Sequence, residues 1–239
     1  NNLVVTAAKA AGKALKYKTV PRLAFTIHKS VPVAGGMGGG SADAAAALLA
    51  AQSVWGKWLT MSELDEVATS IGADVPFALM GGSAIGEGTG HELTPIAQKC
   101  QLHWVLVPND FGLSTPAVYA ELDRLRAERG ENPASMPMAQ MEQRLIEALR
   151  DGAPAEEIAP LLHNDLEEAA ISLRPELKTL LAMKDQVFAL HAMISGSGPT
   201  VAMLARDAQD AIAIASRLRT YGQPCVITSS PAGAAQLVF

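Results

Sequence analysis

A run of glycines leads directly into a strongly helix-forming sequence, and this junction constrains the fold more than any other stretch of the chain. Five of the six residues 35–40 are glycine, and residues 42–55 read ADAAAALLAAQSVW. Glycine adopts backbone angles that other residues avoid and allows another group to approach the main chain. A glycine loop that ends in a helix presents free N–H groups at the positive end of the helix dipole. We therefore predict an anion site, most commonly used for phosphate, with Ser41 as the helix N-cap and Asp43 in the first turn.

The loop matches neither of two familiar phosphate-binding motifs. The spacing Gly35-x-x-x-x-Gly40 is that of a Walker A loop, but Ser41 stands where that motif has lysine. A dinucleotide-binding G-x-G-x-x-G beginning at Gly36 would also need glycine at position 41. A flexible connector before a core helix is the alternative, although five glycines cost more backbone entropy than a connector requires. Lys29, shortly before the loop, is expected to be a solvated strand end rather than an anion ligand.

The composition is that of a well-packed globular chain. Of 239 residues, 49% are hydrophobic and 18% are charged, and the net charge of −5 argues against a nucleic-acid-binding protein. Cys100 and Cys225 lie far apart, and the histidines lack metal-ligand spacing, which fits a reducing cytosol without a zinc site or disulfide framework. The longest apolar run, residues 44–51, is too short to span a membrane. Because the chain starts at Asn1 without methionine, we expect that it lacks an N-terminal piece.

The hydrophobic periodicity mixes helices and strands, with a break expected near residues 99–101. Helices are predicted over residues 3–15 with Asn2 as cap, 42–55, 62–70 with a Ser62–Asp65 capping box, 117–128 after Ser114 with Pro116 at the first position, 139–150, 156–173, 175–190 and 208–221. Strands are predicted at residues 23–27, at two places within 83–97, at 102–108, on both sides of 195–198, at 225–229 and at 235–239, the last as an edge strand. A loop is predicted over residues 129–137.

Asp74 is the single residue of greatest chemical interest. It lies in the sequence Ile71-Gly-Ala-Asp-Val-Pro-Phe77, where a short helical turn is predicted to expose its side chain. One interpretation is an N-cap for the turn that Pro76 helps to begin. The other is a carboxylate that faces the anion site and takes a proton from an attacking hydroxyl group, a role that phosphoryl transfer allows even to a weak base.

The sequence Ser195-Gly-Ser-Gly198 is a second glycine turn, of a kind that packs beside phosphates. It is not a nucleophile elbow, because Ser195 stands where G-x-S-x-G has glycine. A plain hairpin turn between two strands is the alternative.

Three blocks, residues 32–43, 71–77 and 194–199, occur in an order that resembles the GHMP kinase superfamily. Residues 38–44, 72–76 and 164–167 resemble the branch that phosphorylates the 2-hydroxyl of a cytidine-diphosphate methylerythritol in non-mevalonate isoprenoid biosynthesis. The resemblance extends from Asn1 to about Leu204. It implies an α+β, two-domain fold: an N-terminal, ATP-binding half of ribosomal-S5-domain-2-like type over residues 1–100, incomplete at its start, and a C-terminal α+β half over 101–239.

The resemblance also implies roles for individual residues. Asp74 would be the catalytic base, Thr115 and Tyr119 would line the cytidine pocket, and Mg²⁺, with ligands unknown, would accompany ATP. The turn Ser195, Gly196, Ser197 and Gly198 would lie near the phosphates. The loop that would wrap the ATP phosphates consists of Pro32, Val33, Ala34, Gly35, Gly36, Met37, Gly38, Gly39, Gly40, Ser41 and Ala42.

The sequence departs from the family pattern in two respects. Ala42 replaces a second serine that the family often has after its glycines, and the strand with the catalytic lysine and the Tyr-His pair that recognises cytidine are absent from the printed sequence. A kinase for another small alcohol, such as homoserine or mevalonate, and a non-catalytic nucleotide-binding member are the alternatives. No membrane or nucleic-acid partner is expected.

Overall fold

The computed structural model describes residues 2–32, 35–131 and 143–238. The predicted loop over 129–137 and the predicted helix start at 139 therefore fall partly outside the described residues. The α+β class expected from the sequence is confirmed. The chain forms two compact units: the first contains Asn1–Val31, Gly38–Ile96 and Pro231–Phe239, and the second contains Pro32–Met37 and Ala97–Ser230.

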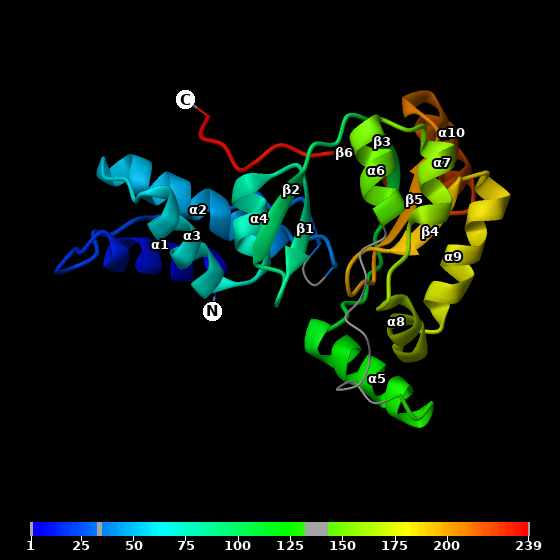
Figure 1. The fold of residues 1–239 in the computed structure, drawn as a ribbon, viewed down its shortest axis with the longest axis horizontal. Helices are drawn as coiled ribbons and strands as arrows, with labels where there is room; N and C mark the ends of the chain where they lie inside the picture. Colours follow the sequence, from blue (N-terminus) through cyan, green and yellow to red (C-terminus); the bar gives the residue numbers. More distant parts are fainter. Residues whose placement is uncertain (1, 33–34, 132–142, 239) are drawn as a thin grey trace. The chain divides into compact units, whose positions relative to one another are not determined.

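The first unit is built from packed helices and one hairpin. Its elements are α1 (Leu3–Ala14), α2 (Gly39–Trp55), α3 (Met61–Ile71), α4 (Asp74–Met80), β1 (Ser83–Glu87) and β2 (Glu92–Ile96), the last two paired antiparallel. Helix α1 packs on α2 and α3, and α4 packs on α2 (Figure 1). Alanines dominate the shared core around Leu48, which is fully buried, and their small side chains let the helices approach closely.

The second unit contains a four-stranded antiparallel sheet in the order β4-β5-β3-β6. Its strands are β3 (Leu102–Val107), β4 (His191–Ile194), β5 (Val201–Ala205) and β6 (Val226–Ser230). Its helices are α5 (Thr115–Glu128), α6 (Gln143–Asp151), α7 (Ala155–Ile158), the 3₁₀ helix η2 (Ala159–Leu161), α8 (Glu167–Leu173), α9 (Glu176–Val187) and α10 (Ala208–Thr220).

The core of the second unit lies on one face of this sheet. In the central strands Val105 pairs with Met203 and Val107 with Val201, and all four side chains are buried. They share a hydrophobic core with residues of α5, α8, α9 and α10. Figure 1 shows α9 and α10 running along the strands. Val105 and Val107, two residues apart in β3, thus point from the same side of the pleat into this core.

Helix α2 begins earlier than the sequence predicts. Its N-cap is Gly38 and its first residue is Gly39, so the prediction that Ser41 caps the helix is wrong, and Asp43 lies beyond the first turn. A Cβ atom at Gly39 would lie 2.9 Å from Cγ1 of Val31. This close packing keeps a glycine inside the helix, although glycine has a low helix propensity.

Two other helix starts also differ from prediction by a residue or two. The capping box of α3 is formed by Thr60 and Glu63, each bonding the backbone N–H of the other, so the predicted box of Ser62 and Asp65 is wrong. Glutamate at the third position suits this motif better than aspartate because its longer side chain reaches back to the cap. Pro116 occupies the second, not the first, position of α5.

Two predicted strands do not form. Residues 23–27 alternate in hydrophobicity but pair with no described segment, and a strand requires a partner for its backbone groups. The predicted edge strand at 235–239 is absent over its described residues, 235–238. In its place, the N–H group of Ala235 donates to the carbonyl of Ala78 at 3.0 Å.

The predicted helix over residues 156–173 is interrupted. It forms α7, the short η2 and α8, with residues 162–166 outside any helix. Pro160 has no N–H group for a continuing helix, and Asn164 uses its side chain in bonds to another segment. The other predicted helices and strands are present, with shifts of a few residues at their ends.

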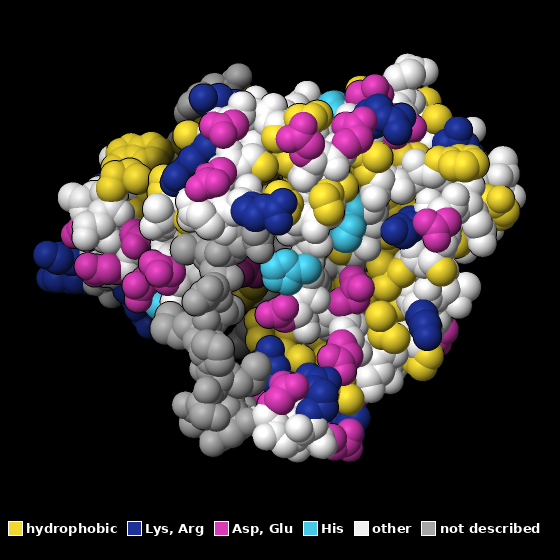
Figure 2. All heavy atoms as spheres, turned by 45° about the vertical axis from the view of Figure 1, so that its right-hand side comes forward, with side chains coloured by type: hydrophobic (Ala, Val, Ile, Leu, Met, Phe, Trp, Pro, Cys, Tyr) yellow, Lys and Arg dark blue, Asp and Glu magenta, His cyan; other side chains and the backbone are white. Residues whose placement is uncertain are grey.

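Charges of both signs are distributed over the surface. On the face drawn in Figure 2, Lys and Arg side chains lie interspersed with Asp and Glu. Among the described residues, no helix is both long enough and apolar enough to cross a membrane.

Candidate functional site

The first half of the glycine loop belongs to the second unit, where it rests on the turn between β4 and β5. Ser195 Oγ donates to the carbonyl of Gly36 at 2.8 Å, and the N–H of Thr200 donates to the carbonyl of Gly35 at 3.4 Å. Gly36 has a φ of +73°, and a Cβ atom there would lie 2.2 Å from the Ser195 carbonyl oxygen. Only glycine fits this contact, which fixes the loop at Gly36.

The turn itself connects two paired strands. The N–H of Ser195 donates to the carbonyl of Thr200, and the N–H of Gly198 donates to the carbonyl of Ser195. Gly196 and Gly198 both have positive φ values, of 55° and 78°. The segment is therefore a hairpin connection, as one interpretation predicted, and it also supports the glycine loop.

Asn164 and Glu167 hold the strand end that leads into this turn. The Asn164 amide donates to the carbonyls of Ile194 at 2.8 Å and Gly196 at 2.7 Å. The Glu167 carboxylate accepts from the N–H of Ile194 at 3.0 Å. Residues 164–167, which the sequence marked only through a family resemblance, thus fix the backbone just before and within the turn.

The two predicted substrate residues lie on α5 in the same unit. The hydroxyl of Thr115, the first residue of the helix, lies 2.8 Å from the hydroxyl of Ser197 in the turn. Tyr119, one turn later, is 53% exposed, so its ring is not buried in a helix interface. The exposed residues Thr115 and Tyr119 thus lie one helical turn apart at the start of α5.

Helix α5 is tied to α8 by a charged network. Arg124 donates to the Glu121 carboxylate at 2.7 and 2.8 Å, and the Ser172 hydroxyl of α8 donates to the same carboxylate. The Arg124 hydrogen bond, followed by the Ser172 bond, holds the pKa of Glu121 at about 2. Glu121 therefore stays ionised at neutral pH, which keeps this link between the helices intact.

The second half of the glycine loop begins α2 in the first unit. Gly38 caps the helix with a φ of +62°, and among the described residues no side chain forms a capping hydrogen bond with the first N–H groups. Lys29 Nζ lies 2.5 Å from Oδ2 of Asp43 and 3.3 Å from where a Cβ at Gly39 would lie. Lys29 is exposed, as expected, but it lies in no strand and pairs with Asp43, so its charge lies beside the start of the helix.

Asp74 is the first residue of α4, whose N-cap is Ala73, so the N-cap interpretation of Asp74 is wrong. The neighbouring Val75 is fully buried and anchors this turn in the core. The Asp74 side chain is exposed and forms no hydrogen bond or ion pair with any described residue. Its carboxylate is free to bind a ligand or accept a proton.

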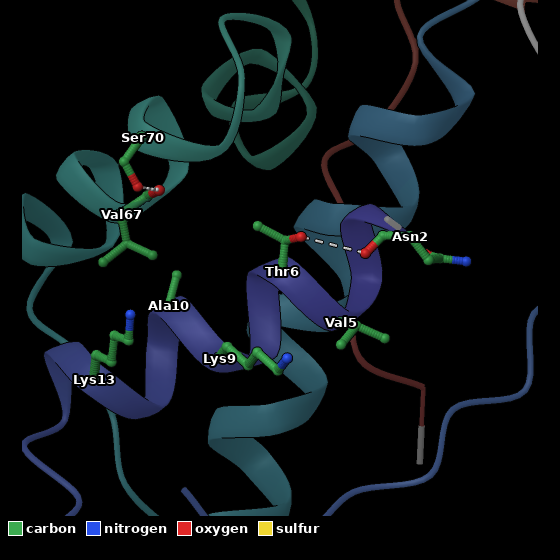
Figure 3. A pocket seen from close by; sticks show the side chains of 8 residues that line it. All are labelled: Asn2, Val5, Thr6, Lys9, Ala10, Lys13, Val67 and Ser70. Carbon is green, nitrogen blue, oxygen red and sulfur yellow. Dashed lines mark hydrogen bonds between the residues drawn. The ribbon is translucent and has the colours of Figure 1, made fainter.

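Each unit has a hollow on its surface. The hollow in the first unit, of about 650 Å³, lies between α1 and α3 and contains none of the predicted site residues (Figure 3). The hollow in the second unit, of about 500 Å³, includes Ser195 and Gly196, together with side chains of the sheet such as Trp104. Within the described ranges, no three His, Cys, Asp or Glu side chains gather as metal ligands would.

The structure thus assigns the predicted residues to particular elements. The second unit unites Gly35 and Gly36 with the turn 195–198 and with Thr115; the first unit holds Gly38 to Ala42 and Asp74, while Val33 and Ala34 lie outside the described residues. Sequence reasoning missed the Lys29–Asp43 pair and the support from Asn164. Neither has a spacing signal, because each links segments that are far apart in the chain.

Comparison with known proteins identifies the family. Residues 2–82 match the model of the GHMP kinases N terminal domain, and residues 145–223 match the GHMP kinases C terminal model. The chain is 43% identical over 238 residues to the 4-diphosphocytidyl-2-C-methyl-D-erythritol kinase of Pseudarthrobacter chlorophenolicus. This alignment covers 100% of this chain and 73% of that protein. It is 42% identical over 240 residues to the kinase of the same name from Arthrobacter sp. strain FB24, covering 99% of this chain and 72% of that protein.

A solved structure supports the same assignment. The crystal structure of a 4-(cytidine 5'-diphospho)-2C-methyl-D-erythritol kinase is 28% identical and superposes with a TM-score of 0.74, covering 98% of this chain and 79% of that chain. The chain therefore belongs to the 4-diphosphocytidyl-2-C-methyl-D-erythritol kinase family, within the GHMP kinases.

Proposed function

We propose that this protein transfers the γ-phosphoryl group of ATP to the 2-hydroxyl of 4-diphosphocytidyl-2-C-methyl-D-erythritol, a step of non-mevalonate isoprenoid biosynthesis. The observation that carries the proposal is the 43% identity, over the whole chain, to a relative of that name. We take residues 1–100 as the ATP-binding domain and residues 101–239 as the C-terminal domain, although Pro32–Met37 belong to the second compact unit and Pro231–Phe239 to the first. The geometry of the glycine loop, the turn and α5 supports it independently.

The glycine loop from Pro32 to Ala42 binds the phosphates of ATP. The first N–H groups of α2 have no side-chain cap among the described residues and lie at the positive end of the helix dipole, where an anion is stabilised. Lys29 lies beside Gly39, and its positive charge is shared with the paired Asp43 carboxylate. The turn from Ser195 to Gly198 contributes indirectly, because Ser195 fixes the carbonyl of Gly36.

Asp74 acts as the general base. Its exposed carboxylate has no described partner, so it can accept the proton of the attacking 2-hydroxyl group. The hydroxyl oxygen then forms a bond to the γ-phosphorus as the bond from that phosphorus to the bridging oxygen of ADP breaks. The transition state is loose, so orientation of the hydroxyl group matters more than strong deprotonation.

Thr115 and Tyr119 bind the cytidine part of the substrate. The Tyr119 ring is exposed and can stack on a pyrimidine, and the Thr115 hydroxyl lies on the same side of α5. Mg²⁺ would accompany the ATP phosphates; the Ser41 hydroxyl and the Asp43 carboxylate near the start of α2 are oxygen donors of the type that this ion prefers.

The enzyme is expected to work in the cytoplasm on small molecules. Cys100 and Cys225 are both free, as in reducing compartments, and the net charge of −5 does not favour nucleic acid. A homoserine or mevalonate kinase is the second candidate within the superfamily, and a non-catalytic nucleotide-binding protein is the third. Neither is favoured, because the high-coverage relatives described above carry the cytidyl-substrate name.

A substrate panel tests this function. The enzyme, as its gene encodes it, is given ATP and Mg²⁺ with each candidate alcohol, and ADP release is followed. The cytidine-diphosphate methylerythritol should be turned over best, since homoserine and mevalonate have no flat ring to stack. Preference for either of them, or no turnover with any alcohol, would contradict the proposal.

A second measurement asks whether Tyr119 stacks on the substrate. Base–aromatic stacking is worth about 1–3 kcal/mol per base, so Tyr119→Ala should raise the KM for the cytidine substrate by roughly 5- to 150-fold. The KM for ATP should stay nearly constant. Tyr221→Ala is the matched control, because Tyr221 is 54% exposed at the end of α10, in the same unit. Equal effects of the two substitutions would show that Tyr119 does not contact the substrate.

A further inference from the structure

Ser197 is a buried hydroxyl with an exposed partner. The residue is only 7% exposed, and its Oγ has one hydrogen-bond partner among the described residues, the hydroxyl of Thr115 at 2.8 Å. Thr115 itself is exposed at the start of α5. The pair therefore connects the protein interior with a surface that the proposed function assigns to the substrate.

The environment of Ser197 sets the direction of this hydrogen bond. A buried hydroxyl that donates to nothing carries a desolvation penalty, and Thr115 is the one acceptor that Ser197 reaches among the described residues. The 2.8 Å distance fits either direction, and this penalty favours Ser197 as the donor and Thr115 Oγ1 as the acceptor. The proton of Thr115 must then point elsewhere, toward solvent or a ligand, because a hydroxyl group has a single proton.

The backbone around Ser197 is held from several sides. Asn164 binds the carbonyls of Ile194 and Gly196, and Ser195 binds the carbonyl of Gly36. A Cβ atom at Gly198 would lie 2.9 Å from a side-chain carbon of Ile194, so the turn is also closely packed. Ser197 therefore presents its hydroxyl from a fixed position.

We infer that Ser197 is a positioning residue for the acceptor substrate: by donating to Thr115, it makes the Thr115 hydroxyl a directed donor to an acceptor oxygen or nitrogen of the bound cytidine-diphosphate alcohol. This inference rests on the proposed function, since it takes Thr115 as a substrate contact. Ser195, two residues earlier, points its hydroxyl to the glycine loop. The two serines of one turn therefore serve different ligands, Ser197 the alcohol and Ser195 the nucleotide.

A double-mutant cycle tests this role. Ser197→Cys keeps nearly the same shape with a much weaker donor, and Thr115→Val removes the hydroxyl while keeping the branched side chain. Each should raise the KM for the cytidine substrate by about tenfold, the scale of one lost hydrogen bond, with a smaller effect on the KM for ATP. The double variant should be no worse than Thr115→Val alone, because Ser197 acts only through Thr115.

Ser195→Ala provides the contrast, because it should raise the KM for ATP rather than that for the alcohol. Additive effects of Ser197→Cys and Thr115→Val, or an unchanged KM in Ser197→Cys, would overturn the inference while leaving the proposed function intact. If the wild-type enzyme prefers another alcohol, the proposed function fails. The same double-mutant cycle, measured as the KM for that alcohol, then still decides the role of Ser197. Absence of turnover with any alcohol would overturn both.

Discussion

Replacing Asp74 by asparagine is expected to lower turnover of the cytidine substrate by about 10² or more, the usual scale for loss of a general base. The amide keeps the size and shape of the side chain but cannot accept the proton of the attacking hydroxyl group. Because Asp74 is exposed and bonds to no described residue, the substitution breaks no contact of the fold. The KM for ATP and the melting temperature should change little.

Asp65→Asn is the matched control for this substitution. Asp65 is another exposed carboxylate of the first unit, on α3 rather than α4, and its replacement should leave turnover unchanged. Steady-state rates of ADP release at saturating ATP and substrate measure both variants. If Asp74→Asn keeps most of the wild-type rate, the carboxylate is not the base, and its place at the first turn of α4 serves only the helix dipole.

The sequence predicted most of the elements, because their signals are local. The Asn2 cap is an example: its side chain accepts from the N–H of Val4 at 2.9 Å, as the residue type at that position suggests. The strand β3 is another: the apolar run at 102–108 predicts a buried strand, and Leu102, Val105 and Val107 are buried in it. Periodicity and capping are properties of neighbouring residues, and tertiary contacts did not override them here.

The errors arose where distant segments decide the outcome. Gly39 lies inside α2 because Val31 packs against it, and the predicted helix over 156–173 opens because Asn164 bonds the backbone of β4 and the turn beyond it. The segment 23–27 has the alternation of a strand but pairs with no described segment. None of these causes is visible within a window of neighbouring residues.

The candidate site shows the same division. The glycine density indicated an anion site, and residue type singled out Asp74, but the partners of these residues came only from the structure. Lys29 is 14 residues from Asp43 in sequence, and Ser197 is 82 residues from Thr115. Such pairs have no sequence pattern of their own, so the sequence marked these residues one by one but not the contacts that join them.

The glycine at position 36 should be the least replaceable residue of the loop. Gly36→Ala places a Cβ atom 2.2 Å from the Ser195 carbonyl oxygen and 2.8 Å from both the backbone nitrogen and the carbonyl oxygen of Gly198. Backbone atoms of a packed turn cannot move aside as a flexible side chain can. We expect a loss of about 1–2 kcal/mol from the positive φ and about 1–3 kcal/mol more from the overpacking.

Gly222→Ala separates these two contributions. Gly222 has a φ of +74°, close to that of Gly36, lies in the same unit after α10, and has no atom within 4 Å of an added Cβ. It should therefore lose only the contribution of the positive φ, about 1–2 kcal/mol in the free energy of unfolding, and keep its affinity for ATP. Urea unfolding of the two variants measures the difference.

Gly36→Ala should also weaken ATP binding, because the strain at position 36 would be relieved if the loop moved away from the turn. The N–H groups that follow in the loop then no longer converge on the phosphates, and the loss of one hydrogen bond to a charged group costs about 1.5–3 kcal/mol. The Kd for a non-hydrolysable ATP analogue, measured by calorimetry, should accordingly rise more than about tenfold in Gly36→Ala. A folded Gly36→Ala variant with wild-type affinity would mean that the loop does not bind phosphate and is the connector that the composition alone allowed. The contact between Gly36 and Ser195 would then serve only the packing of the second unit.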